Sequence, residues 1–238
     1  MDPVPIKGFV DLSLVDWPNR VASVVFLPNC NFRCPNCYNV QLVLRPGEMR
    51  AISLEEVLRY LRDRRGWIDG VAITGGEPTL HEGLPGFCEM IKGFGLGVKL
   101  DTNGTNPEMV GELIDRGLVD YVAVDLKAPL TVEKYSKAAG VGVDHFLARI
   151  EKTIDVLLLG RVDYEFRTTL VPTIHELCDV EQICMRIKGC RRYVLQNFKA
   201  DVEMINPMLQ SQKPFTRAQM QAFKEIALKT VPNTFTRE

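Results

Sequence analysis

The fold is decided by residues 21–37, which read VASVVFLPNCNFRCPNC. Residues 21–27 are apolar apart from one serine, as is typical of a strand that is covered on both faces of a sheet. Three cysteines then follow within eight positions, in a loop rich in proline and asparagine. This order indicates that metal chemistry directly follows a buried strand.

The rest of the chain alternates between strand-like runs and helical patterns. Further strands are expected at residues 70–74, 98–101, 121–126, 164–170 and 193–196. Helices are expected at residues 54–61 behind a Ser53-x-x-Glu56 capping box, from Pro107 to just before Gly117, around residues 146–157, and behind a Thr216-x-x-Gln219 capping box. Six strands that alternate with helices predict parallel pairing through right-handed crossovers, so the fold class is α/β.

Length and composition are those of a compact globular protein. The chain has 238 residues, of which 46% are hydrophobic and 25% are charged, and this is enough for one domain with a full core. We expect a single domain over residues 1–238. Residues 1–20 are expected to form an N-terminal flap or hairpin, and residues 199–238 a C-terminal extension that contains a helix.

The composition also argues against several classes of function. The formal net charge is −1, so no basic field for binding nucleic acid is expected. The longest apolar runs are far below the roughly 18 residues of a membrane-spanning helix, and no secretory signal is readable. Clustered cysteines in such a chain indicate metal binding or catalysis rather than disulfides. We therefore expect a cytoplasmic protein that binds neither nucleic acid nor membrane.

Polar residues gather directly after the predicted strands. In parallel α/β sheets, ligands bind at the carboxyl ends of the strands. The clusters at these ends are Gly75-Gly76-Glu77-Pro78, Asp101-Thr102-Asn103-Gly104, Asp125-Leu126-Lys127 and Arg167-Thr168-Thr169. Together with the cysteine loop, they predict a ligand site along this edge of the sheet.

Cys30, Cys34 and Cys37 have the spacing Cys-x-x-x-Cys-x-x-Cys, which lets three thiolates from one loop bind an iron–sulfur cluster. Three protein ligands leave one iron with an open coordination position, where a metal can do chemistry. Two alternatives stay open for this cysteine spacing. One is a zinc site with a fourth ligand such as His81, and the other is a simple electron-transfer protein.

The other four cysteines show no compact metal spacing. Cys88, Cys178, Cys184 and Cys190 are expected to be small buried hydrophobic residues. Reversible redox pairing of Cys184 with Cys190 is a weaker alternative.

Seven short motifs occur along the chain and are considered together. They are Gly8-Phe9-Val10-Asp11, Asp16-Trp17-Pro18, Cys30 to Pro35, Gly75 to Pro78, Asp101 to Gly104, Asp125 to Lys127, and Arg167 to Pro172. Together they resemble the radical S-adenosylmethionine superfamily, and within it the glycyl-radical-enzyme activating proteins. The branch most similar in appearance is the anaerobic ribonucleoside-triphosphate reductase activating proteins, with pyruvate formate-lyase activating enzyme a near relative. Residues 38–70 contain no cysteine, which favours the smaller activating proteins.

The resemblance implies an incomplete (β/α)6 barrel, open on one side, and two cofactors. The three clustered cysteines would bind a [4Fe–4S] cluster, whose unique iron would take the amine and carboxylate of S-adenosylmethionine. Gly75 and Gly76 would let the backbone approach the ligand closely, and Glu77 would receive its ammonium group.

Further site residues follow from the same resemblance. In pyruvate formate-lyase activating enzyme, the residues that match Asp101, Thr102 and Asp125 surround a monovalent cation near the methionyl carboxylate. The other positions that match S-adenosylmethionine or substrate-loop contacts are Asn103, Lys127 and Arg167. The chain departs from the family at Asn36, where an aromatic residue usually contacts the adenine, whereas here Tyr38 follows the third cysteine.

The reaction implied by the resemblance is reductive cleavage of S-adenosylmethionine. A donor such as flavodoxin or ferredoxin reduces the cluster, methionine leaves, and a 5′-deoxyadenosyl radical abstracts hydrogen from a glycine Cα of a partner enzyme. The implied partner is an anaerobic ribonucleotide reductase or a pyruvate formate-lyase-like protein. The alternative within the superfamily is a radical enzyme acting on a small molecule, such as one resembling 7-carboxy-7-deazaguanine synthase.

Overall fold

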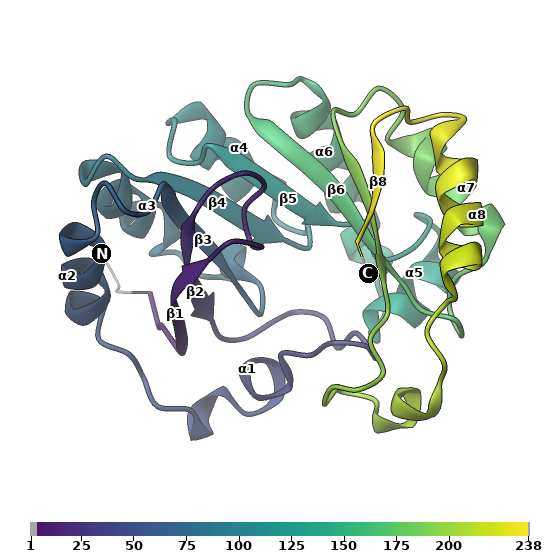
Figure 1. Ribbon diagram of the computed structural model, residues 1–238, viewed down its shortest axis with the longest axis horizontal. Coiled ribbons are helices and arrows are strands. Elements are labelled where there is room, and N and C mark those ends of the chain that lie inside the picture. Colours follow the sequence, from purple (N-terminus) through teal and green to yellow (C-terminus); the bar gives the residue numbers. More distant parts are fainter. Residues whose placement is uncertain (1–3, 238) are drawn as a thin grey trace. The chain divides into compact units, whose positions relative to one another are not determined.

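The computed structural model, drawn in Figure 1, describes residues 4–237. The contacts among these residues divide the chain into two compact units. The first unit comprises the residues up to 31 together with 41–102 and 108–122. The second unit comprises residues 32–40 and 103–107 and those from 123 onward. The boundary between the units therefore falls inside the cysteine loop. The expectation of a single domain over residues 1–238, with an N-terminal flap and a C-terminal extension, stays a prediction.

The strands of the first unit lie side by side in chain order. They are β1 (Gly8–Ser13), β2 (Ala22–Leu27), β3 (Gly70–Gly75) and β4 (Gly97–Thr102). The first pair, β1 and β2, is antiparallel, whereas β2, β3 and β4 run parallel to one another. Residues 22–25 and 70–73 are almost fully buried, which explains why these two strands read as continuous apolar runs.

Helices connect these strands and cover the sheet. The helical segments that lie mainly in the first unit are α1 (Val40–Leu44), η1 (Pro46–Glu48), α2 (Leu54–Asp63), η2 (Pro78–Leu80), α3 (Leu84–Gly93) and α4 (Pro107–Asp115). The buried side of α2 is formed by Val57 and Leu61, as its helical spacing predicts. Ser53 precedes α2, but its side chain caps no backbone group, so the predicted capping box at Ser53 is wrong.

The second unit contains parallel strands as well. They are β5 (Tyr121–Asp125), whose first two residues belong to the first unit, β6 (Asp163–Leu170), β7 (Tyr193–Asn197) and β8 (Thr234–Arg237). Both the β6–β7 and the β7–β8 pairs are parallel. Just beyond β5, the Leu126 amide donates to the Arg167 carbonyl on β6 at 2.8 Å. The polar residues that follow β5 are thereby held beside β6.

Five helical segments accompany these strands. They are α5 (Val132–Ala139), α6 (Asp144–Leu158), α7 (Leu177–Arg186), η3 (Pro207–Ser211) and α8 (Arg217–Leu228). The predicted capping box of α8 is confirmed, because the Thr216 hydroxyl accepts from the Gln219 amide and the Gln219 side chain accepts from the Thr216 amide. Met220, Phe223 and Ala227 form the buried face of α8, which packs against α7, β7 and β8.

All six predicted strands are present, each within one residue of its predicted ends. The predicted helices correspond to α2, α4, α6 and α8. The structure adds β1 and β8, which the apolar pattern did not predict because both have several exposed residues and lack a continuous apolar run. The parallel α/β class is confirmed.

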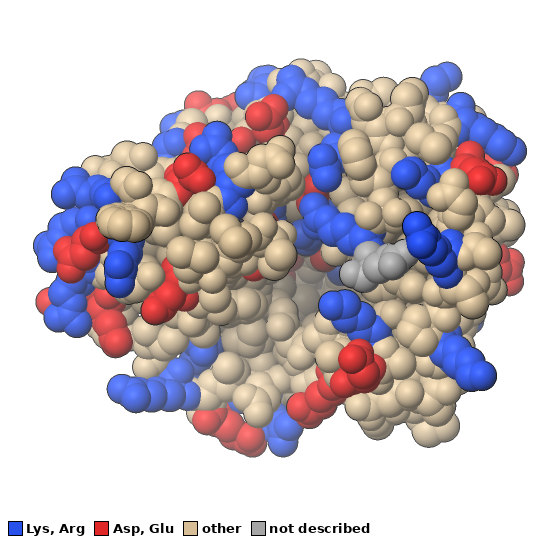
Figure 2. Space-filling view, in the orientation of Figure 1, with Lys and Arg blue, Asp and Glu red and all other residues tan. Residues whose placement is uncertain are grey.

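Charged side chains of both signs are interspersed on the face drawn in Figure 2. No continuous field of one sign is visible on that face, in keeping with the formal net charge of −1. Among residues 4–237, no helix is both long and apolar enough to cross a bilayer.

Candidate functional site

The loop that carries Cys30 follows β2 and is fixed by hydrogen bonds within the first unit. Asn29 has a φ of 64°, in the left-handed region that asparagine tolerates better than most residues. Its carbonyl accepts from the Glu77 amide at 2.7 Å. His81, the residue that a zinc site would use, contacts the Pro28 carbonyl through Nε2 at 2.8 Å. The chain therefore leaves the sheet toward Cys30 in a fixed direction.

Gly75 and Gly76 lie where β3 ends against this loop. Gly75 has a φ of 120°, and a Cβ there would lie 2.3 Å from the Leu27 carbonyl oxygen. A Cβ on Gly76 would lie only 1.8 Å from the Asn29 carbonyl oxygen. Both positions therefore need glycine so that the end of β3 can pack against the backbone that leads to Cys30. Their predicted approach to a ligand stays a prediction.

Glu77 is a buried carboxylate held by several donors. Its Oε1 accepts from the Thr79 amide at 3.1 Å, from the Thr79 hydroxyl at 2.5 Å and from the Thr102 hydroxyl at 2.6 Å. Because these donors come from the adjoining turn and from the end of β4, the carboxylate has a fixed orientation. The structure thus brings together Glu77 and Thr102, two of the predicted site residues.

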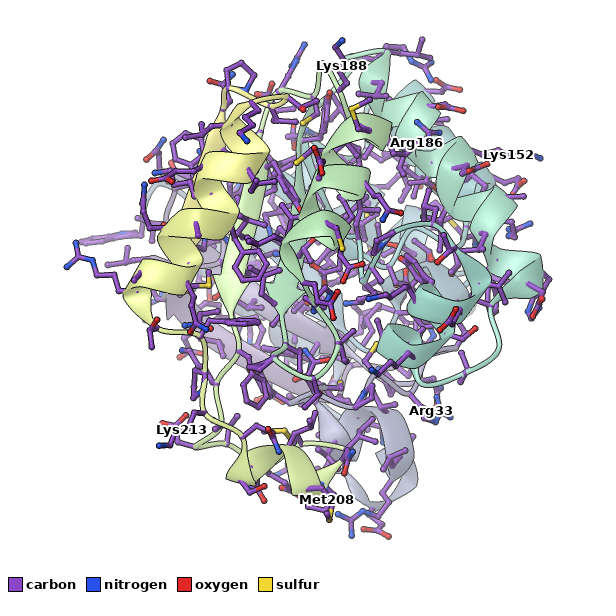
Figure 3. All side chains as sticks on the ribbon, turned by 90° about the vertical axis from the view of Figure 1, so that its right-hand side faces the viewer. Arg33, Lys152, Arg186, Lys188, Met208 and Lys213 are labelled. Carbon is purple, nitrogen blue, oxygen red and sulfur yellow. The ribbon has the colours of Figure 1, made fainter. Side chains whose placement is uncertain are left out.

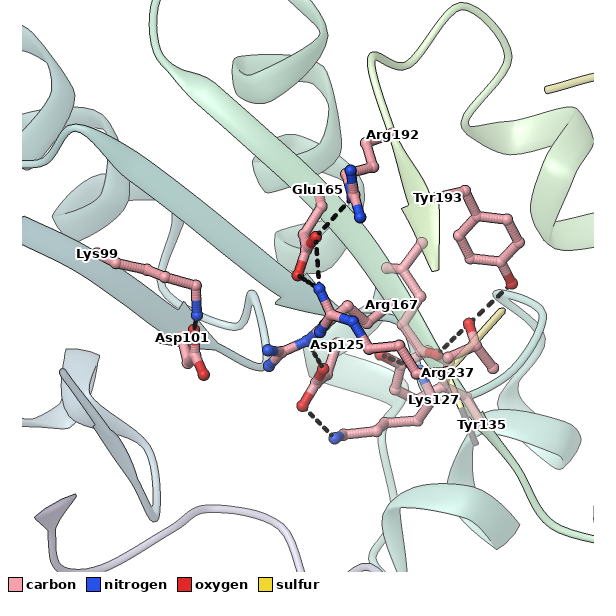
Figure 4. A network of polar contacts seen from close by, with 12 residues as sticks. Lys99, Asp101, Asp125, Lys127, Tyr135, Glu165, Arg167, Arg192, Tyr193 and Arg237 are labelled. Carbon is pink, nitrogen blue, oxygen red and sulfur yellow. Dashed lines mark hydrogen bonds and ion pairs between the residues drawn. The ribbon is translucent and has the colours of Figure 1, made fainter. Parts of the chain in front are cut away.

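Asp101, another predicted site residue, pairs with Lys99 on the same strand (Figure 4). The two residues are two positions apart on β4, so their side chains lie on the same face of the sheet. The Lys99 side chain is 1% exposed and the Asp101 side chain is 13% exposed. An ion pair this deeply buried is a constant part of the structure rather than a solvated surface contact.

Cys34 and Cys37 belong to the second unit, where backbone hydrogen bonds shape their loop. The Cys37 amide donates to the Cys34 carbonyl at 3.0 Å and closes a turn between the two thiols. The Ile205 amide donates to the Cys37 carbonyl at 3.2 Å, and the Asn206 amide to the Pro35 carbonyl at 2.9 Å. The C-terminal extension therefore fixes the outer part of the cysteine loop.

The residues just before Cys34 are anchored in the core of the second unit. The buried ring of Phe32 packs edge-on against Tyr135 and Phe146, with centroid distances of 6.3 and 5.5 Å. A Cβ on Gly140 would lie 1.9 Å from the Arg33 carbonyl oxygen, so the end of α5 can approach the loop only with glycine at this position. This packing holds the start of the Cys34 loop from inside the unit.

Tyr38 contacts the C-terminal extension. Its hydroxyl accepts from the Lys199 amide at 2.8 Å, and burial raises the pKa of Tyr38, which keeps the hydroxyl neutral. Farther along the extension, Met208 is exposed and lies at the edge of the molecule in Figure 3, near Lys213. The loss of the family's adenine contact at Asn36 stays a prediction.

Asp125, Lys127 and Arg167 form one charge network in the second unit (Figure 4). The Arg167 Nε lies 2.8 Å from Asp125 Oδ1, and the Lys127 Nζ lies 3.1 Å from Asp125 Oδ2. Desolvation alone would raise the pKa of Asp125, but the guanidinium and the ammonium together hold that pKa well below its ordinary value. The carboxylate is therefore ionised at any physiological pH and aligns two cations. The structure thus joins three of the predicted site residues.

His175 fixes the main chain at Lys127. Its Nδ1 accepts from the Val171 amide at 3.0 Å, so the proton lies on Nε2, which donates to the Lys127 carbonyl at 2.8 Å. Burial lowers the pKa of His175, which keeps the ring neutral. The Tyr135 hydroxyl accepts from the Lys127 amide at 3.3 Å. The backbone of Lys127 is thus held on both sides.

Asn103 closes a turn within the second unit. Its Oδ1 accepts from the Thr105 amide at 3.0 Å and from the Thr105 hydroxyl at 2.7 Å. The next residue, Gly104, has a positive φ of 77°, and its carbonyl accepts from the Thr153 hydroxyl on α6 at 2.7 Å. The Asn103 side chain thus stabilises this turn, and its predicted contact with the cofactor stays a prediction.

The clustered cysteines have the chemistry of a cluster-binding set. All seven cysteines lie within residues 4–237, none is in a disulfide, and the three clustered thiols are partly exposed. Burial raises the pKa of the Cys34 thiol to about 11, although the Lys127 ammonium opposes this, and burial also raises the pKa of Cys37. A metal that binds here must displace protons from these thiols. Within the described residues, no three His, Cys, Asp or Glu side chains are arranged around a single metal ion.

The other four cysteines differ in how deeply they are buried. Cys88, Cys184 and Cys190 are buried, as predicted. The same prediction is wrong for Cys178, which is exposed. It lies in the first turn of α7, away from the buried face that includes Ile183 and Cys184. Cys184 and Cys190 are both free thiols in this structure, and their reversible redox pairing stays a prediction.

The fold and these loops define a class of protein: a parallel α/β protein with a three-cysteine loop directly after its first parallel strand. Residues 24–174 match the family model described as Radical SAM superfamily. The chain belongs to the radical SAM superfamily, whose members are enzymes that use a [4Fe–4S] cluster and S-adenosylmethionine. The predicted family, fold class and enzymatic character are confirmed.

The chain is also similar to individual proteins and to solved structures. Two proteins of Methanocaldococcus jannaschii carry the name "Putative glycyl-radical enzyme activating enzyme". One is 35% identical over 195 residues, which cover 82% of this chain and 80% of the relative, and the other is 27% identical over 95% of this chain and 85% of the relative. Among solved structures, a radical SAM methyltransferase from Sphaerobacter thermophilus has a TM-score of 0.67 at 14% identity, over 95% of this chain and 68% of that one. This last similarity concerns the fold alone.

Three features of this region could not be predicted from the sequence. Lys99 lay inside a predicted strand, and only its buried partner Asp101 makes it noteworthy. The contacts of His175 are to backbone carbonyl and amide groups, which leave no signature in the sequence. The same holds for the hydrogen bonds from residues 205 and 206 to the cysteine loop.

Proposed function

We propose that this enzyme cleaves S-adenosylmethionine reductively and places a glycyl radical on a partner enzyme. The observation that carries the proposal is the triplet Cys30, Cys34 and Cys37, three thiols of one loop after the first parallel strand in a radical SAM chain. The names of the two archaeal relatives support glycyl radical formation as the use of the radical. The proposed partner is an anaerobic ribonucleotide reductase or a pyruvate formate-lyase-like protein.

The cysteines hold the redox cofactor in this proposal. Cys30, Cys34 and Cys37 would supply three thiolates to a [4Fe–4S] cluster. When bound, the cluster would supply the electron for reductive cleavage of S-adenosylmethionine, with flavodoxin or ferredoxin as the electron source. The hydrogen bonds from the Ile205 and Asn206 amides to the Cys37 and Pro35 carbonyls hold the backbone of this loop.

The polar residues that follow the strands are the proposed contacts to S-adenosylmethionine. Glu77, held by its three donors, accepts from the ammonium group of the ligand. Gly75 and Gly76 let the end of β3 pack against the backbone that leads to Cys30. We propose that the same lack of side chains lets this loop approach a ligand closely. The remaining proposed contacts come from Asp101, Thr102, Asn103, Asp125, Lys127 and Arg167.

Lys127 and Arg167 are suited to bind negative charge. Lys127 follows the end of β5, Arg167 lies within β6, and the Asp125 carboxylate contacts both cationic groups. We propose that these two cationic groups bind a carboxylate of the ligand or of the substrate loop. His175 keeps Lys127 in place through its backbone.

A cysteine variant tests the first half of the proposal. After anaerobic reconstitution with iron and sulfide, Cys34→Ala is expected to lose cluster absorbance and to form no 5′-deoxyadenosine above background, because a thiolate ligand is missing. Cys88→Ala, which removes a buried thiol outside the loop, is the matched control and should retain both signals. Equal 5′-deoxyadenosine formation by wild type and Cys34→Ala would show that the triplet does not hold the reactive cluster.

Electron paramagnetic resonance tests the second half. The reduced enzyme, S-adenosylmethionine and a candidate glycyl radical enzyme are mixed anaerobically, and a glycyl doublet on the partner is expected. The partner's glycine-to-alanine variant is the control and should give no doublet. Repeated conversion of a small molecule with no protein radical would instead support the alternative that resembles 7-carboxy-7-deazaguanine synthase.

A further inference from the structure

We propose that the Lys99 ammonium is a built-in counter-ion of Asp101 and stands where the family resemblance places a monovalent metal cation. This inference rests on the proposed function, in which Asp101 belongs to the S-adenosylmethionine site. It corrects one expectation of that resemblance, because it makes binding of S-adenosylmethionine independent of potassium or sodium. Three observations carry it: the burial of Lys99, the pairing of Asp101, and the pairing of Asp125.

The first observation is the surroundings of Lys99 within the first unit. On β3, Ala72 is the registered neighbour of Lys99, and Ala72 in turn neighbours Val24 on β2. Side chains of registered neighbours in parallel strands lie on the same face. The stem of Lys99 therefore lies beside the small side chain of Ala72, with the branched side chain of Val24 one strand farther along the same face, and both apolar residues are fully buried.

On the same face of the sheet, the residues two positions before Ala72 and Lys99 are glycines, and Trp17 covers them. Gly70 and Gly97 are registered neighbours, and a Cβ on either would lie 2.7 or 3.0 Å from the ring of Trp17. The indole thus covers the two glycines and forms an apolar surface next to the row that contains Lys99. A charged ammonium in such surroundings is costly unless it is paired, and its partner is Asp101.

The second observation concerns Asp101. Its carboxylate is neutralised by an ammonium that comes from the same strand two residues earlier. Because Lys99 is covalently attached, its local concentration at Asp101 is fixed by the fold, whereas a free cation competes only at its concentration in solution. Displacement of Lys99 would also leave a buried ammonium without its counter-ion. An added monovalent cation is therefore disfavoured at this carboxylate.

The third observation is that the other carboxylate assigned to the cation is also paired. In the second unit, Asp125 contacts Arg167 at 2.8 Å and Lys127 at 3.1 Å. Each of the two carboxylates among the candidate cation ligands thus has a resident cationic side chain in its own unit, and the third candidate, Thr102, donates its hydroxyl to Glu77. The residues present do not fit an additional monovalent cation, and no step of the reaction is assigned to one.

The test compares two salts at an equal ionic strength of about 0.15 M. Binding of S-adenosylmethionine to the reconstituted wild-type enzyme is measured by equilibrium dialysis in potassium chloride and in tetramethylammonium chloride, whose cation is too large for a metal site. The two dissociation constants are expected to agree within about twofold. Affinity that is about tenfold higher in potassium, equivalent to about 1.4 kcal/mol, would overturn the proposal.

Variants of Lys99 test whether removing its charge makes binding of S-adenosylmethionine depend on potassium. Lys99→Met keeps the apolar stem and removes the charge, so it is expected to bind S-adenosylmethionine about tenfold more weakly in tetramethylammonium and to regain affinity in potassium. Lys99→Arg, which keeps the charge, should show no potassium dependence. The double variant Lys99→Met/Asp101→Asn has neither charge and should show no potassium dependence either. Equal affinity of Lys99→Met and wild type in both salts would contradict the proposal.

Thermal unfolding without S-adenosylmethionine separates this inference from the proposed function. The melting temperature of Lys99→Met is expected to be higher in potassium than in tetramethylammonium, whereas that of wild type should be the same in both. If S-adenosylmethionine binds in neither salt, the proposed function fails while the melting comparison still decides the role of Lys99. If Lys99→Met does not fold in either salt, the wild-type comparison decides, because a potassium-dependent melting temperature there overturns the proposal.

Discussion

Asp125 shows how one carboxylate organises two cations at the end of a strand. Asn at this position would keep the shape of the side chain but remove the negative charge that contacts Arg167 and Lys127, whose side chains are 12% and 25% exposed. We expect Asp125→Asn to lower the free energy of unfolding by about 1–3 kcal/mol at pH 7, less than for a fully buried pair because water screens all three groups. Urea unfolding measures this, with the exposed Asp63→Asn as the matched control.

The same substitution has a defined pH dependence. Because the pKa of Asp125 is lower in the folded protein than in the unfolded chain, its stabilisation is present above the unfolded value of about 3.9 and is lost as the pH falls through the folded value. The difference in unfolding free energy between wild type and Asp125→Asn should therefore shrink below about pH 4. A difference that is constant from pH 7 to the most acid pH at which the protein stays folded would contradict the assigned charge network.

Single residues differ in how far sequence alone could assign them. Cys30, Cys34 and Cys37 were identifiable because their spacing is itself the signal. Lys99 was not, because its importance comes from burial beside Ala72 and pairing with Asp101, and burial emerges only when the strands are in register. The exposed position of Cys178 could not be read from the sequence either, since it depends on which face of α7 packs against the rest of its unit.

At the scale of elements, the contact between the end of β3 and the cysteine loop gives a sharp prediction. Gly76→Ala would place a Cβ 1.8 Å from the Asn29 carbonyl oxygen, a backbone atom that cannot move without breaking its bond to the Glu77 amide. We expect a loss of about 2–4 kcal/mol in the free energy of unfolding, together with a lower iron content after reconstitution.

Gly111→Ala in α4 is the matched control for that experiment. No atom lies within 4 Å of its added Cβ, and alanine has the higher helix propensity. This variant should be more stable than wild type by about 0.5–1 kcal/mol and should load iron normally. Equal effects of Gly76→Ala and Gly111→Ala would mean that the loop contact has no structural importance.

The strands were predictable from the sequence because those covered on both faces read as continuous apolar runs, and β2 and β3 are the clearest examples. Several helices were not. Pro85, Gly86 and Gly93 obscure α3, and α5 is short and mostly polar. The antiparallel strand β1 is largely exposed, so it lacks the alternation that a half-buried strand would show.

At the scale of the whole molecule, buried thiols are expected to set the alkaline limit of stability of the metal-free protein. Burial raises the pKa of Cys88 and of Cys184 to about 12, and that of Cys190 to about 11. The unfolded chain therefore releases these protons first, near its ordinary thiol pKa of about 8.5. Stability is fully retained below that pH and falls as the pH rises toward the folded values.

The decrease in the free energy of unfolding with rising pH should be measurable between about pH 9 and pH 11 by urea unfolding. Cys88→Ala is expected to flatten the slope by up to about 1.4 kcal/mol per pH unit, because one buried thiol is removed. Cys178→Ala removes an exposed thiol and is the matched control. An unchanged slope in Cys88→Ala would show that this thiol does not contribute to the alkaline limit.

The C-terminal extension is the part of the molecule that the sequence described least. The helix behind Thr216 was predicted from its capping box, and it is present as α8. The preceding segment has no periodic pattern, yet its amides at Ile205 and Asn206 bind the cysteine loop. Backbone hydrogen bonds between residues so far apart leave no trace in residue types, so only the folded structure reveals them.

The packing of Trp17 on Gly70 and Gly97 also gives this enzyme an optical reporter. The chain has two tryptophans, of which Trp17 is buried in the first unit and Trp67 is exposed. Their fluorescence should differ accordingly, with emission from Trp17 at shorter wavelength and protected from a soluble quencher such as acrylamide. Trp67→Phe would leave a single indole next to the row that contains Lys99. Its emission would follow changes in that part of the sheet without any attached dye.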